Sequence, residues 1–346
     1  MTTRVVIRQW AEPVAVEPGA TILEAALAAG VPYPHGCRSG NCGACKSRLL
    51  SGEVEMTPYS EYALTESERR AGLILACRST VWDDAEVAWL ETEDMMVHPR
   101  RQLTCRVIGR ATVTHDIVRL RLAITAGGPF TFSAGQYCAL TFDGLAARDY
   151  SMANRPDEDE LEFHIRRLDG TDPARNASAY AFDRLSLGDS VSAEGPFGTA
   201  YLRELHAGPI IAVAGGSGLA PIKSIVEAVL SRGAGQPIHL YFGVRSERDL
   251  YLEDHLAGLA ARHANLHFVP VLSEPRGATA RRTGLVTDAV AADMTSLDGC
   301  KVYTAGPPVM VEAMTATAIE LGARREDIHA DAFYTEADKL KLRAAS

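Results

Sequence analysis

The chain has 346 residues, more than one ordinary domain needs, so it can form two or three separate hydrophobic cores. Its composition, 47% hydrophobic and 23% charged with a mean hydropathy of −0.04, excludes a disordered or membrane-embedded chain. The net charge of −9 argues against a protein that binds nucleic acid through a basic surface. Seven cysteines are too few for a dense disulfide framework, which favours a reduced, cytoplasmic setting.

The sequence offers no signal for export or membrane insertion. The first 16 residues alternate like a pair of strands and lack the basic start, apolar block and cleavage site of a signal peptide. The most apolar stretch, residues 210–222, is broken by glycines and is shorter than the roughly 20 residues that span a bilayer. We therefore expect no membrane partner.

Residues 1–94 are predicted to form a small mixed domain. Strands are expected over residues 4–9 and 13–16, where apolar and polar residues alternate. Thr21 and, three positions later, Glu24 form the sequence signature of a capping box, which predicts that a short helix begins there.

The rest of the chain changes its hydrophobic period once. Residues 95–101 read as a linker, because they combine charge and a proline with little periodicity. Short alternating strands over residues 102–205 predict an antiparallel barrel. Over residues 206–346 apolar strands alternate with helices, the first helix being expected from Pro221, which predicts a parallel sheet with right-handed crossovers.

Four cysteines share the spacing C-x4-C-x2-C, with a fourth cysteine after 31 intervening residues. They are Cys37, Cys42, Cys45 and Cys77. This is the spacing by which plant-type ferredoxins hold a [2Fe-2S] cluster through four thiolates. Gly36, Gly40 and Gly43 stand where such a tight loop requires unusual backbone angles and a close approach to the cluster.

The alternative for these cysteines is a structural zinc site. Zinc sites use two well-separated cysteine pairs, whereas here three cysteines lie in one loop, which favours the cluster. Cys105, Cys138 and Cys300 lie in apolar strand patterns and are expected to be buried thiols without a role.

A second candidate site lies in the barrel block, where Arg148, Tyr150 and Ser151 form an R-x-Y-S pattern after a turn. Arginine can pair with a pyrophosphate, tyrosine can lie against a flavin ring, and serine can offer its hydroxyl to a ring nitrogen. The pattern alone is a weak signal, because an arginine and a tyrosine often leave a strand together, and it needs its context.

A glycine-rich turn joins the first strand of the last block to a helix. It contains Gly216, Ser217, Gly218 and Pro221. Its backbone N–H groups could receive a pyrophosphate at the start of the helix, although the glycines could equally serve only a tight turn. The nucleophile elbow of serine hydrolases, G-x-S-x-G, is excluded because position 219 is Leu.

A second such turn contains Gly306 and Pro307. Both turns follow strands, so they are predicted at the same carboxyl edge of the sheet, where open α/β sheets bind ligands. The strand after the first turn leads to Arg245 instead of the acidic residue expected to bind a ribose, so a standard dinucleotide-binding fold is not predicted.

The order of these motifs resembles one family. Ferredoxin-type cysteines, R-x-Y-S, GGSGLAP and AGPP follow one another as in the reductase components of bacterial multicomponent oxygenases, and look most like the naphthalene dioxygenase reductase type. These proteins are ferredoxin–NADP reductase-like flavoproteins with an N-terminal plant-type ferredoxin domain. The resemblance implies a β-grasp-like ferredoxin domain over 1–94, an FAD-binding antiparallel barrel over 102–205 and a parallel-sheet, NAD-binding domain over 206–346.

The resemblance also implies roles for individual residues. Arg148 would hold the flavin phosphate, Tyr150 would flank the isoalloxazine ring, and Ser151 would hydrogen-bond near N5, the hydride-accepting atom. The next flavin-lining strand would contain His164, Ile165 and Arg166. The nicotinamide site would be lined by Gly216, Ser217, Gly218 and Pro221, with Gly306 and Pro307 opposite. Phe333, or else its neighbour Tyr334, would cover the flavin on the nicotinamide side.

Two positions depart from the family pattern. Relatives commonly have a cysteine where this chain has Ala305, which removes a thiol from the expected hydride path. The Gly-Gly turn that often grips the FAD pyrophosphate is replaced by the longer segment 169–176. FAD remains the expected flavin because the domain order matches FAD members, with FMN as the alternative.

The expected reaction is hydride transfer from NADH to the flavin, followed by single-electron steps through the cluster to a Rieske ferredoxin or a terminal oxygenase. NADH is favoured by the resemblance, although Arg245 could grip the 2′-phosphate of NADPH. One alternative is a reductase for a P450 or diiron monooxygenase. Another is an iron–sulfur carrier or sensor without hydride chemistry.

The acidic charge is concentrated in the first block. Residues 1–94 contain 8 Lys and Arg against 14 Asp and Glu, a net charge of −6. We therefore expect the electron acceptor to present a basic patch to this domain.

Overall fold

The computed structural model describes the chain from Thr3 to Tyr334 with internal gaps. The described residues are 3–35, 38, 40, 43–61, 63–90, 96–168 and 176–334. The chain divides into a compact unit that includes Met1–Met95 and a second unit of Met96–Ala330. Among the described residues, every helix is too short or too polar to cross a lipid bilayer.

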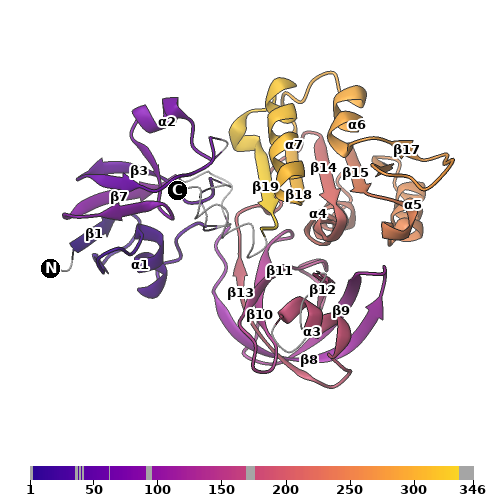
Figure 1. Ribbon diagram of the computed structural model, residues 1–346. Helices are drawn as coiled ribbons and strands as arrows, with labels where there is room; N and C mark the ends of the chain where they lie inside the picture. Colours follow the sequence, from indigo (N-terminus) through magenta and orange to yellow (C-terminus); the bar gives the residue numbers. More distant parts are fainter. Residues whose placement is uncertain are drawn as a thin grey trace. The chain divides into compact units, whose positions relative to one another are not determined.

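The first unit is a mixed sheet with a helix packed on it (Figure 1). Its elements are β1 (Thr3–Ile7), β2 (Val14–Val16), α1 (Ile22–Ala28), β3 (Lys46–Ser51), β4 (Val54–Met56), α2 (Glu66–Arg70), β5 (Leu73–Leu75), β6 (Ser79–Val81) and β7 (Ala85–Trp89). The sheet has the order β2-β1-β7-β3-β5, in which β1 and β7 are parallel, as in a β-grasp fold. The capping box predicted at α1 is present, since Thr21 accepts from the Glu24 N–H and Glu24 accepts from the Thr21 N–H.

The second unit begins with the predicted antiparallel barrel. Its elements are β8 (Arg101–Thr112), β9 (Ile117–Ala126), β10 (Tyr137–Thr141), β11 (Arg148–Ser151), β12 (Glu160–Arg166), α3 (Ala177–Asp183) and β13 (Ser190–Phe197). The strand order is β11-β10-β13-β8-β9-β12, with every neighbouring pair antiparallel. A single bridge between Met152 and Phe163 links the two ends of this order, so the sheet is nearly closed.

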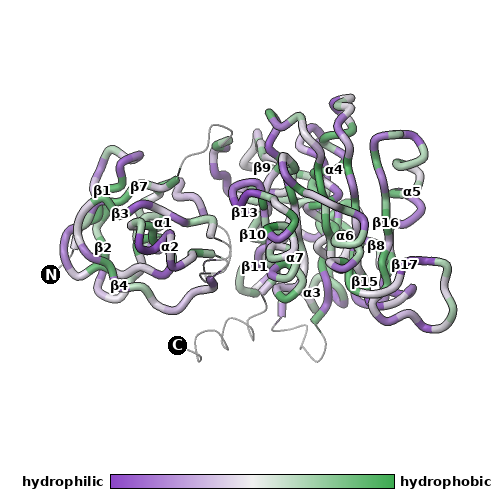
Figure 2. Tube along the Cα trace, turned by 90° about the horizontal axis from the view of Figure 1, so that it is seen from above, coloured by the Kyte–Doolittle hydropathy of each residue, from purple (hydrophilic) through white to green (hydrophobic). Residues whose placement is uncertain are grey.

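The second unit ends in the predicted parallel sheet with helices. Its elements are β14 (Ile210–Gly215), η1 (Gly216–Gly218), α4 (Leu219–Ser231), β15 (Ile238–Val244), η2 (Glu247–Asp249), α5 (Glu253–Arg262), β16 (Leu266–Leu272), β17 (Arg282–Thr283), α6 (Val286–Asp293), β18 (Lys301–Gly306), α7 (Pro308–Glu320), η3 (Arg325–Asp327) and β19 (Ile328–Ala332). One core packs α4 and α5 against the sheet, and a separate core packs α6 and α7 against its other face. In Figure 2 the apolar residues accordingly follow the strands and helices, and the loops are more hydrophilic.

The strand order β17-β16-β15-β14-β18-β19 reverses direction at β14. The chain runs from β14 to β15 and β16 on one side and then returns to place β18 on the other side of β14. The crevice beyond the carboxyl ends of β14 and β18 is therefore the topological switch point, where open sheets of this kind bind ligands. Both glycine-rich turns lie there.

Helix α4 begins at Leu219, so the predicted start at Pro221 was two residues late. Proline fits the first turn of a helix because its missing N–H would have no intrahelical partner there. A proline near a helix start therefore marks the first turn rather than the first residue, as Pro221 does here.

The barrel and the nucleotide sheet meet through buried polar contacts between β12 and α4. Lys223 of α4 donates to the Ala153 carbonyl at 3.0 Å, and Ser224 donates to the Asn154 carbonyl at 2.6 Å. Lys223 also lies 3.4 Å from the Glu162 carboxylate of β12. Burial would raise the pKa of Glu162, but the hydrogen bond from His164 and the charge of Lys223 outweigh it and lower the pKa to about 2.

Replacing this carboxylate tests the junction. Glu162→Gln should destabilise the second unit by about 1 to 3 kcal/mol at neutral pH, because it removes the charged acceptor of the His164 hydrogen bond, while Lys223 keeps Glu227 as a partner at 3.1 Å. The folded-state pKa of Glu162 lies below its usual 4.5, so its contribution is complete above about pH 4.5 and is lost as the pH falls toward 2. Urea unfolding at pH 7 and pH 4 measures both effects. The control is Glu160→Gln, on the same strand as Glu162. It removes a more exposed carboxylate that pairs with Arg121 of β9, so the free energy of unfolding should change little.

Candidate functional site

The cysteine loop is described in part, and the described part fits an iron–sulfur cluster. Cys45 and Cys77 are both buried, and the Cys77 N–H points at the Cys45 sulfur at 3.4 Å. A backbone N–H directed at a cysteine sulfur stabilises its thiolate form, as cluster ligation requires. Gly40 and Gly43 have φ of +79° and +74°, the left-handed conformations expected of a tight ligand loop. Cys37, Cys42 and Gly36 lie outside the described residues.

Arg78 adds a second observation that fits an anionic group. A side chain on Gly40 would approach the Arg78 side chain to 2.8 Å, so Arg78 lies directly against the cysteine loop. Its Nε is buried and has no hydrogen-bond partner among the described residues. A buried cationic donor of this kind fits a cluster held by four thiolates better than an uncharged core.

The other three cysteines are buried, as expected. Burial raises the pKa of Cys105 to about 11 and also raises the pKa values of the Cys138 and Cys300 thiols. Thiols with raised pKa values stay protonated and unreactive at neutral pH. Cys105 and Cys138 belong to the barrel core, and Cys300 belongs to the core under α6 and α7.

The R-x-Y-S residues form β11, an end strand of the barrel. Arg148 is exposed, and its guanidinium donates to the neighbouring Ala147 carbonyl while forming no ion pair with a described residue. The Tyr150 ring is half-buried and packs near Phe142 at a centroid distance of 6.4 Å, and burial raises its pKa. The side chain of Ser151 is buried beside it. An exposed cation at a strand edge, followed by a ring and a hydroxyl, suits a phosphate-bearing aromatic group such as a flavin.

The predicted flavin-lining strand is β12, but its side chains point in different directions. Ile165 is fully buried in the barrel core, so only its backbone can line a ligand site. The side chain of His164 faces the nucleotide sheet, where its Nδ1 lies 3.0 Å from the Tyr251 hydroxyl. Arg166 is held by Asp116 at 2.7 Å. Its guanidinium would lie 3.6 Å from a side-chain atom placed on Gly216, so β12 reaches the first glycine turn.

The two glycine turns touch each other through their backbones. A side chain on Gly218 would come within 2.1 Å of the Ala305 carbonyl oxygen, and one on Gly306 within 2.8 Å of the Gly215 carbonyl oxygen. Glycine is therefore required here by packing, which is the structural alternative that the sequence left open. Pro221 lies in the first turn of α4 and Pro307 caps α7, while Ser217 is half-buried between Gly216 and Gly218. Both turns lie at the switch point, where open sheets of this kind bind ligands.

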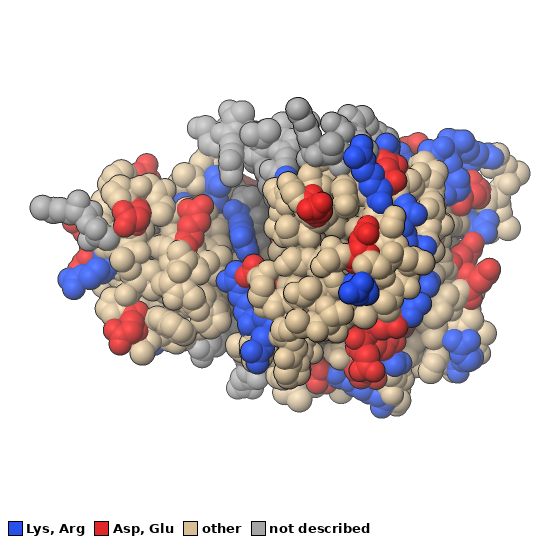
Figure 3. Space-filling model, turned by 90° about the horizontal axis from the view of Figure 1, so that it is seen from below, with Lys and Arg blue, Asp and Glu red and all other residues tan. Residues whose placement is uncertain are grey.

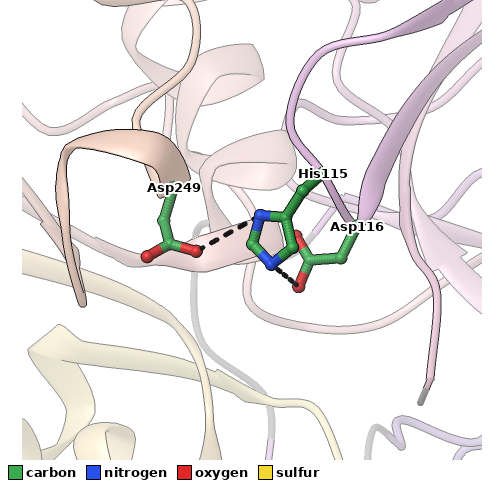
Figure 4. Close-up of side chains that lie close together, drawn as sticks. All are labelled: His115, Asp116 and Asp249. Carbon is green, nitrogen blue, oxygen red and sulfur yellow. Dashed lines mark ion pairs between the residues drawn. The ribbon is translucent and has the colours of Figure 1, made fainter.

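Arg245 lies at the carboxyl end of β15 within a cluster of charged side chains. Figure 4 shows the His115 ring between Asp116 and Asp249, with its nitrogens 3.8 and 3.7 Å from their carboxylates. Arg245 lies 3.3 Å from Asp249, and Arg166 pairs with Asp116. Because arginines already neutralise both carboxylates, we interpret this cluster as an ion-pair network and not as a metal site.

Other predicted residues receive less structural support. Phe333 and Tyr334 directly follow β19 and are both half-buried, and their role at the flavin stays a prediction. Residues 169–175 of the segment proposed to replace the Gly-Gly turn lie outside the described residues. Asn176, which ends it, caps α3 by accepting from the N–H groups of Ser178 and Ala179.

Sequence reasoning missed the polar residues that join the barrel to the nucleotide sheet. Lys223 and Glu227 interrupt the apolar sequence of α4 and pair at 3.1 Å, and charges on a largely buried helix face were a signal for buried polar partners. Asp249 completes a capping box with Ser246, so the spacing S-x-x-D placed an acidic residue near the end of β15 after all. Nothing in the local sequence singled out Tyr251, because its partners lie far away in the chain.

Comparison with known protein families agrees with the three folded parts. The chain matches the 2Fe-2S iron-sulfur cluster binding domain over residues 8–81 and the oxidoreductase FAD-binding domain over residues 104–218. It matches the oxidoreductase NAD-binding domain over residues 212–316. These domains carry the [2Fe-2S] cluster, the FAD and the NAD that the sequence predicted.

Similar proteins with the same order of domains are known. The chain is 41% identical over 321 residues to the ferredoxin–NAD(P)+ reductase component of the naphthalene 1,2-dioxygenase/salicylate 5-hydroxylase systems of a Ralstonia species, covering 92% of this chain and 94% of that protein. It is 40% identical over 318 residues to the reductase component of the naphthalene 1,2-dioxygenase system of Pseudomonas putida, covering 91% and 94%.

Solved structures give the same answer. The crystal structure of the Amycolatopsis cytochrome P450 reductase GcoB has a TM-score of 0.76 at 38% identity and covers 96% of this chain and 99% of that one. The ferredoxin reductase of carbazole 1,9a-dioxygenase has a TM-score of 0.69 at 27% identity, with the same coverage of 96% and 99%. The chain therefore belongs to the ferredoxin–NADP reductase-like flavoproteins with an N-terminal [2Fe-2S] domain, the family of the reductase components of oxygenase systems.

Proposed function

We propose that this chain oxidises NADH in the cytoplasm and delivers the electrons to a Rieske-type ferredoxin or terminal oxygenase that attacks aromatic rings. The supporting observation is the approach of β12 of the barrel to the Gly216–Gly218 turn, where His164 and Arg166 meet residues of the nucleotide sheet. This approach joins a flavin-type strand and a nucleotide-type turn in one crevice. When bound, a flavin would supply the step from the electron pair of the nicotinamide to single electrons, and a [2Fe-2S] cluster would supply a one-electron carrier.

On the barrel side, the residues of β11 bind and orient the flavin. The exposed guanidinium of Arg148 is available to a phosphate, because among the described residues it pairs with no carboxylate. The ring of Tyr150 would lie beside the flavin ring, and the buried hydroxyl of Ser151 would offer it a hydrogen bond. From the family resemblance we expect Phe333 to cover the flavin on the nicotinamide side.

On the nucleotide side, the bare backbone of Gly216, Ser217 and Gly218 receives the nicotinamide half, with Gly306 and Pro307 opposite. Arg166 lies beside this turn, and its guanidinium is held in place by Asp116. It is therefore already oriented before the nucleotide phosphates bind. Ala305 leaves this wall without a thiol. We take NADH as the preferred nucleotide, because Arg245 is already paired with Asp249.

The first unit carries the electron exit. Cys37, Cys42, Cys45 and Cys77 would ligate the cluster, and the Cys77 N–H and Arg78, which lie against the described part of the loop, would stabilise its charge. The exposed carboxylates that form no ion pair among the described residues include Glu12, Glu17, Glu53, Glu55 and Asp83. On the face shown in Figure 3, acidic groups of this unit are separated by uncharged surface. A partner with several basic side chains, not one deep basic pocket, fits this distribution.

A second candidate partner is a cytochrome P450 or a diiron monooxygenase. The likeness to a P450 reductase and to the reductase component of the propane 2-monooxygenase of Mycolicibacterium goodii, 34% identical over 322 residues, favours it. The residues of β11, of the glycine turns and of the cysteine loop would act in the same way for either acceptor. Reconstituting turnover with a Rieske ferredoxin and with a P450, each as purified protein, separates the two.

Anaerobic mixing with a nucleotide tests the proposed reaction. NADH should bleach the visible absorption of the flavin and the cluster, and NADPH should do so more slowly. Stopped-flow absorbance measures both rates on the full, cofactor-loaded chain. If neither chromophore bleaches with NADH, the chain is an iron–sulfur carrier or sensor, and the reductase proposal is wrong.

Loss of a cluster ligand should separate the two halves of the path. In Cys77→Ala the cluster absorption should disappear and transfer to a one-electron protein acceptor should stop, while NADH still bleaches the flavin. Absorbance and electron paramagnetic resonance spectra measure the cluster. Cys300→Ala, which alters a thiol of the nucleotide domain, is the matched control and should keep the full spectrum. An intact cluster in Cys77→Ala would remove Cys77 from the ligand set.

The acidic surface predicts a salt dependence. Raising the ionic strength from about 0.01 M to about 0.15 M shortens the Debye length from roughly 30 Å to roughly 8 Å, so transfer to the protein acceptor should slow. The initial rate of acceptor reduction at several salt concentrations measures this. Reduction of an uncharged quinone by the same sample should stay constant, and a flat salt profile with the protein acceptor would contradict charge steering.

A further inference from the structure

A buried chain of polar groups runs from the first glycine turn to the barrel. The Tyr251 hydroxyl lies 3.4 Å from the Gly216 carbonyl oxygen and 3.0 Å from Nδ1 of His164. Nε2 of His164 lies 3.0 Å from the Glu162 carboxylate, which Lys223 approaches from α4. Tyr251 and His164 are both buried, so no solvent competes for these contacts.

The hydrogen-bond chemistry of this chain determines its direction. Lys223 and His164 keep the Glu162 carboxylate ionised, so it can only accept, and Nε2 of His164 must carry a proton. Burial lowers the pKa of His164, so the ring is neutral and its Nδ1 is an acceptor. The single proton of the Tyr251 hydroxyl is then shared in one three-centre hydrogen bond, with Nδ1 at 3.0 Å as the nearer acceptor and the Gly216 carbonyl oxygen at 3.4 Å as the farther one, so the two acceptors together fix where the hydroxyl points.

The backbone after Tyr251 is strained in a way that supports a role for this residue. Leu252 has φ of +55° and ψ of 18°, a left-handed conformation that is rare for residues with a bulky side chain. Such conformations cost free energy and persist where the surrounding structure requires them, often at functional sites. Here Leu252 is the N-cap of α5, and it directly follows Tyr251, whose hydroxyl contacts His164 of the barrel. The Tyr251 ring is also held edge-on to the rings of His164 and Phe242.

We propose that Tyr251 is a positioning residue for hydride transfer, whose hydroxyl, oriented by His164, holds the Gly216 carbonyl and thereby the backbone of the glycine turn. The inference rests on the proposed function, because it assigns this turn to the nicotinamide half of the nucleotide. Gly216 itself has φ of +55° and no side chain that could anchor it. The Tyr251 hydroxyl therefore restrains the backbone of the turn from a neighbouring segment of the chain.

The variant Tyr251→Phe tests this role because it removes only the hydroxyl. We expect the anaerobic bleaching rate with saturating NADH to fall about tenfold, since small misplacements of reacting groups cost this much or more. Affinity for 5′-AMP should stay within about twofold, because the adenosine half binds away from the turn, near the end of β15. Amide hydrogen exchange over residues 215–218 in the nucleotide-free protein should become faster. The variant should thus have a slower bleaching rate and faster amide exchange at the turn, while its affinity for the adenosine half is retained.

Tyr241→Phe is the matched control. Tyr241 is equally buried in the same domain, and its hydroxyl donates to Asp293 at 3.0 Å, in the core under α6 and away from the glycine turns. It should show wild-type bleaching and exchange at the turn, with at most a small loss of thermal stability. Equal losses of bleaching rate in the two variants would mean that the Tyr251 hydroxyl serves only folding, and wild-type behaviour of Tyr251→Phe would also overturn the proposal.

The proposed function fails separately. If NADH does not bleach the wild-type protein, the reductase proposal is wrong. Exchange over residues 215–218 then still reports whether Tyr251 restrains the turn, because that measurement needs no nucleotide. Unchanged exchange in Tyr251→Phe overturns the inference in either case.

Discussion

The contact between the barrel and the nucleotide sheet depends on one carboxylate, that of Glu162, whose side chain is only 14% exposed. Glu162 stands on a barrel strand, yet its partners include Lys223 from the first helix of the nucleotide sheet and His164, which in turn meets Tyr251. Burying a carboxylate is costly unless charges and donors surround it, so these groups are stable only when barrel and sheet are together. The crevice between the flavin-type strand and the nucleotide-type turn is thus assembled by electrostatics as much as by apolar packing.

The parts of the molecule that the sequence predicted well are those specified by local pattern. The change from alternating strands to apolar strands with helices gave the barrel and the parallel sheet, and the capping box at Thr21 gave the start of α1. The cysteine spacing pointed to the cluster, in agreement with the family comparison. Each of these signals lies within a few residues of the element that it specifies.

The parts that could not be predicted depend on contacts between distant segments. Tyr251 and His164 are 87 positions apart, and Asp116 and Arg166 are 50 apart, so neither pairing leaves a trace in local spacing. The side chain of Ile165 also points into the barrel core, although motif matching had placed it beside the flavin with its neighbours. A motif identifies the strand that lines a site, whereas the pleat decides which of its side chains face it.

The direct backbone contact between the two glycine turns has a mechanical consequence. Where Gly218 meets the Ala305 carbonyl and Gly306 meets the Gly215 carbonyl, no side chain separates the ends of β14 and β18. Rotamer changes therefore cannot absorb a displacement of either strand end, and a shift at the start of α7 must pass undamped to the start of α4. The floor of the crevice behaves as one stiff piece, so adaptation to different nucleotides has to come from the side chains at its rim.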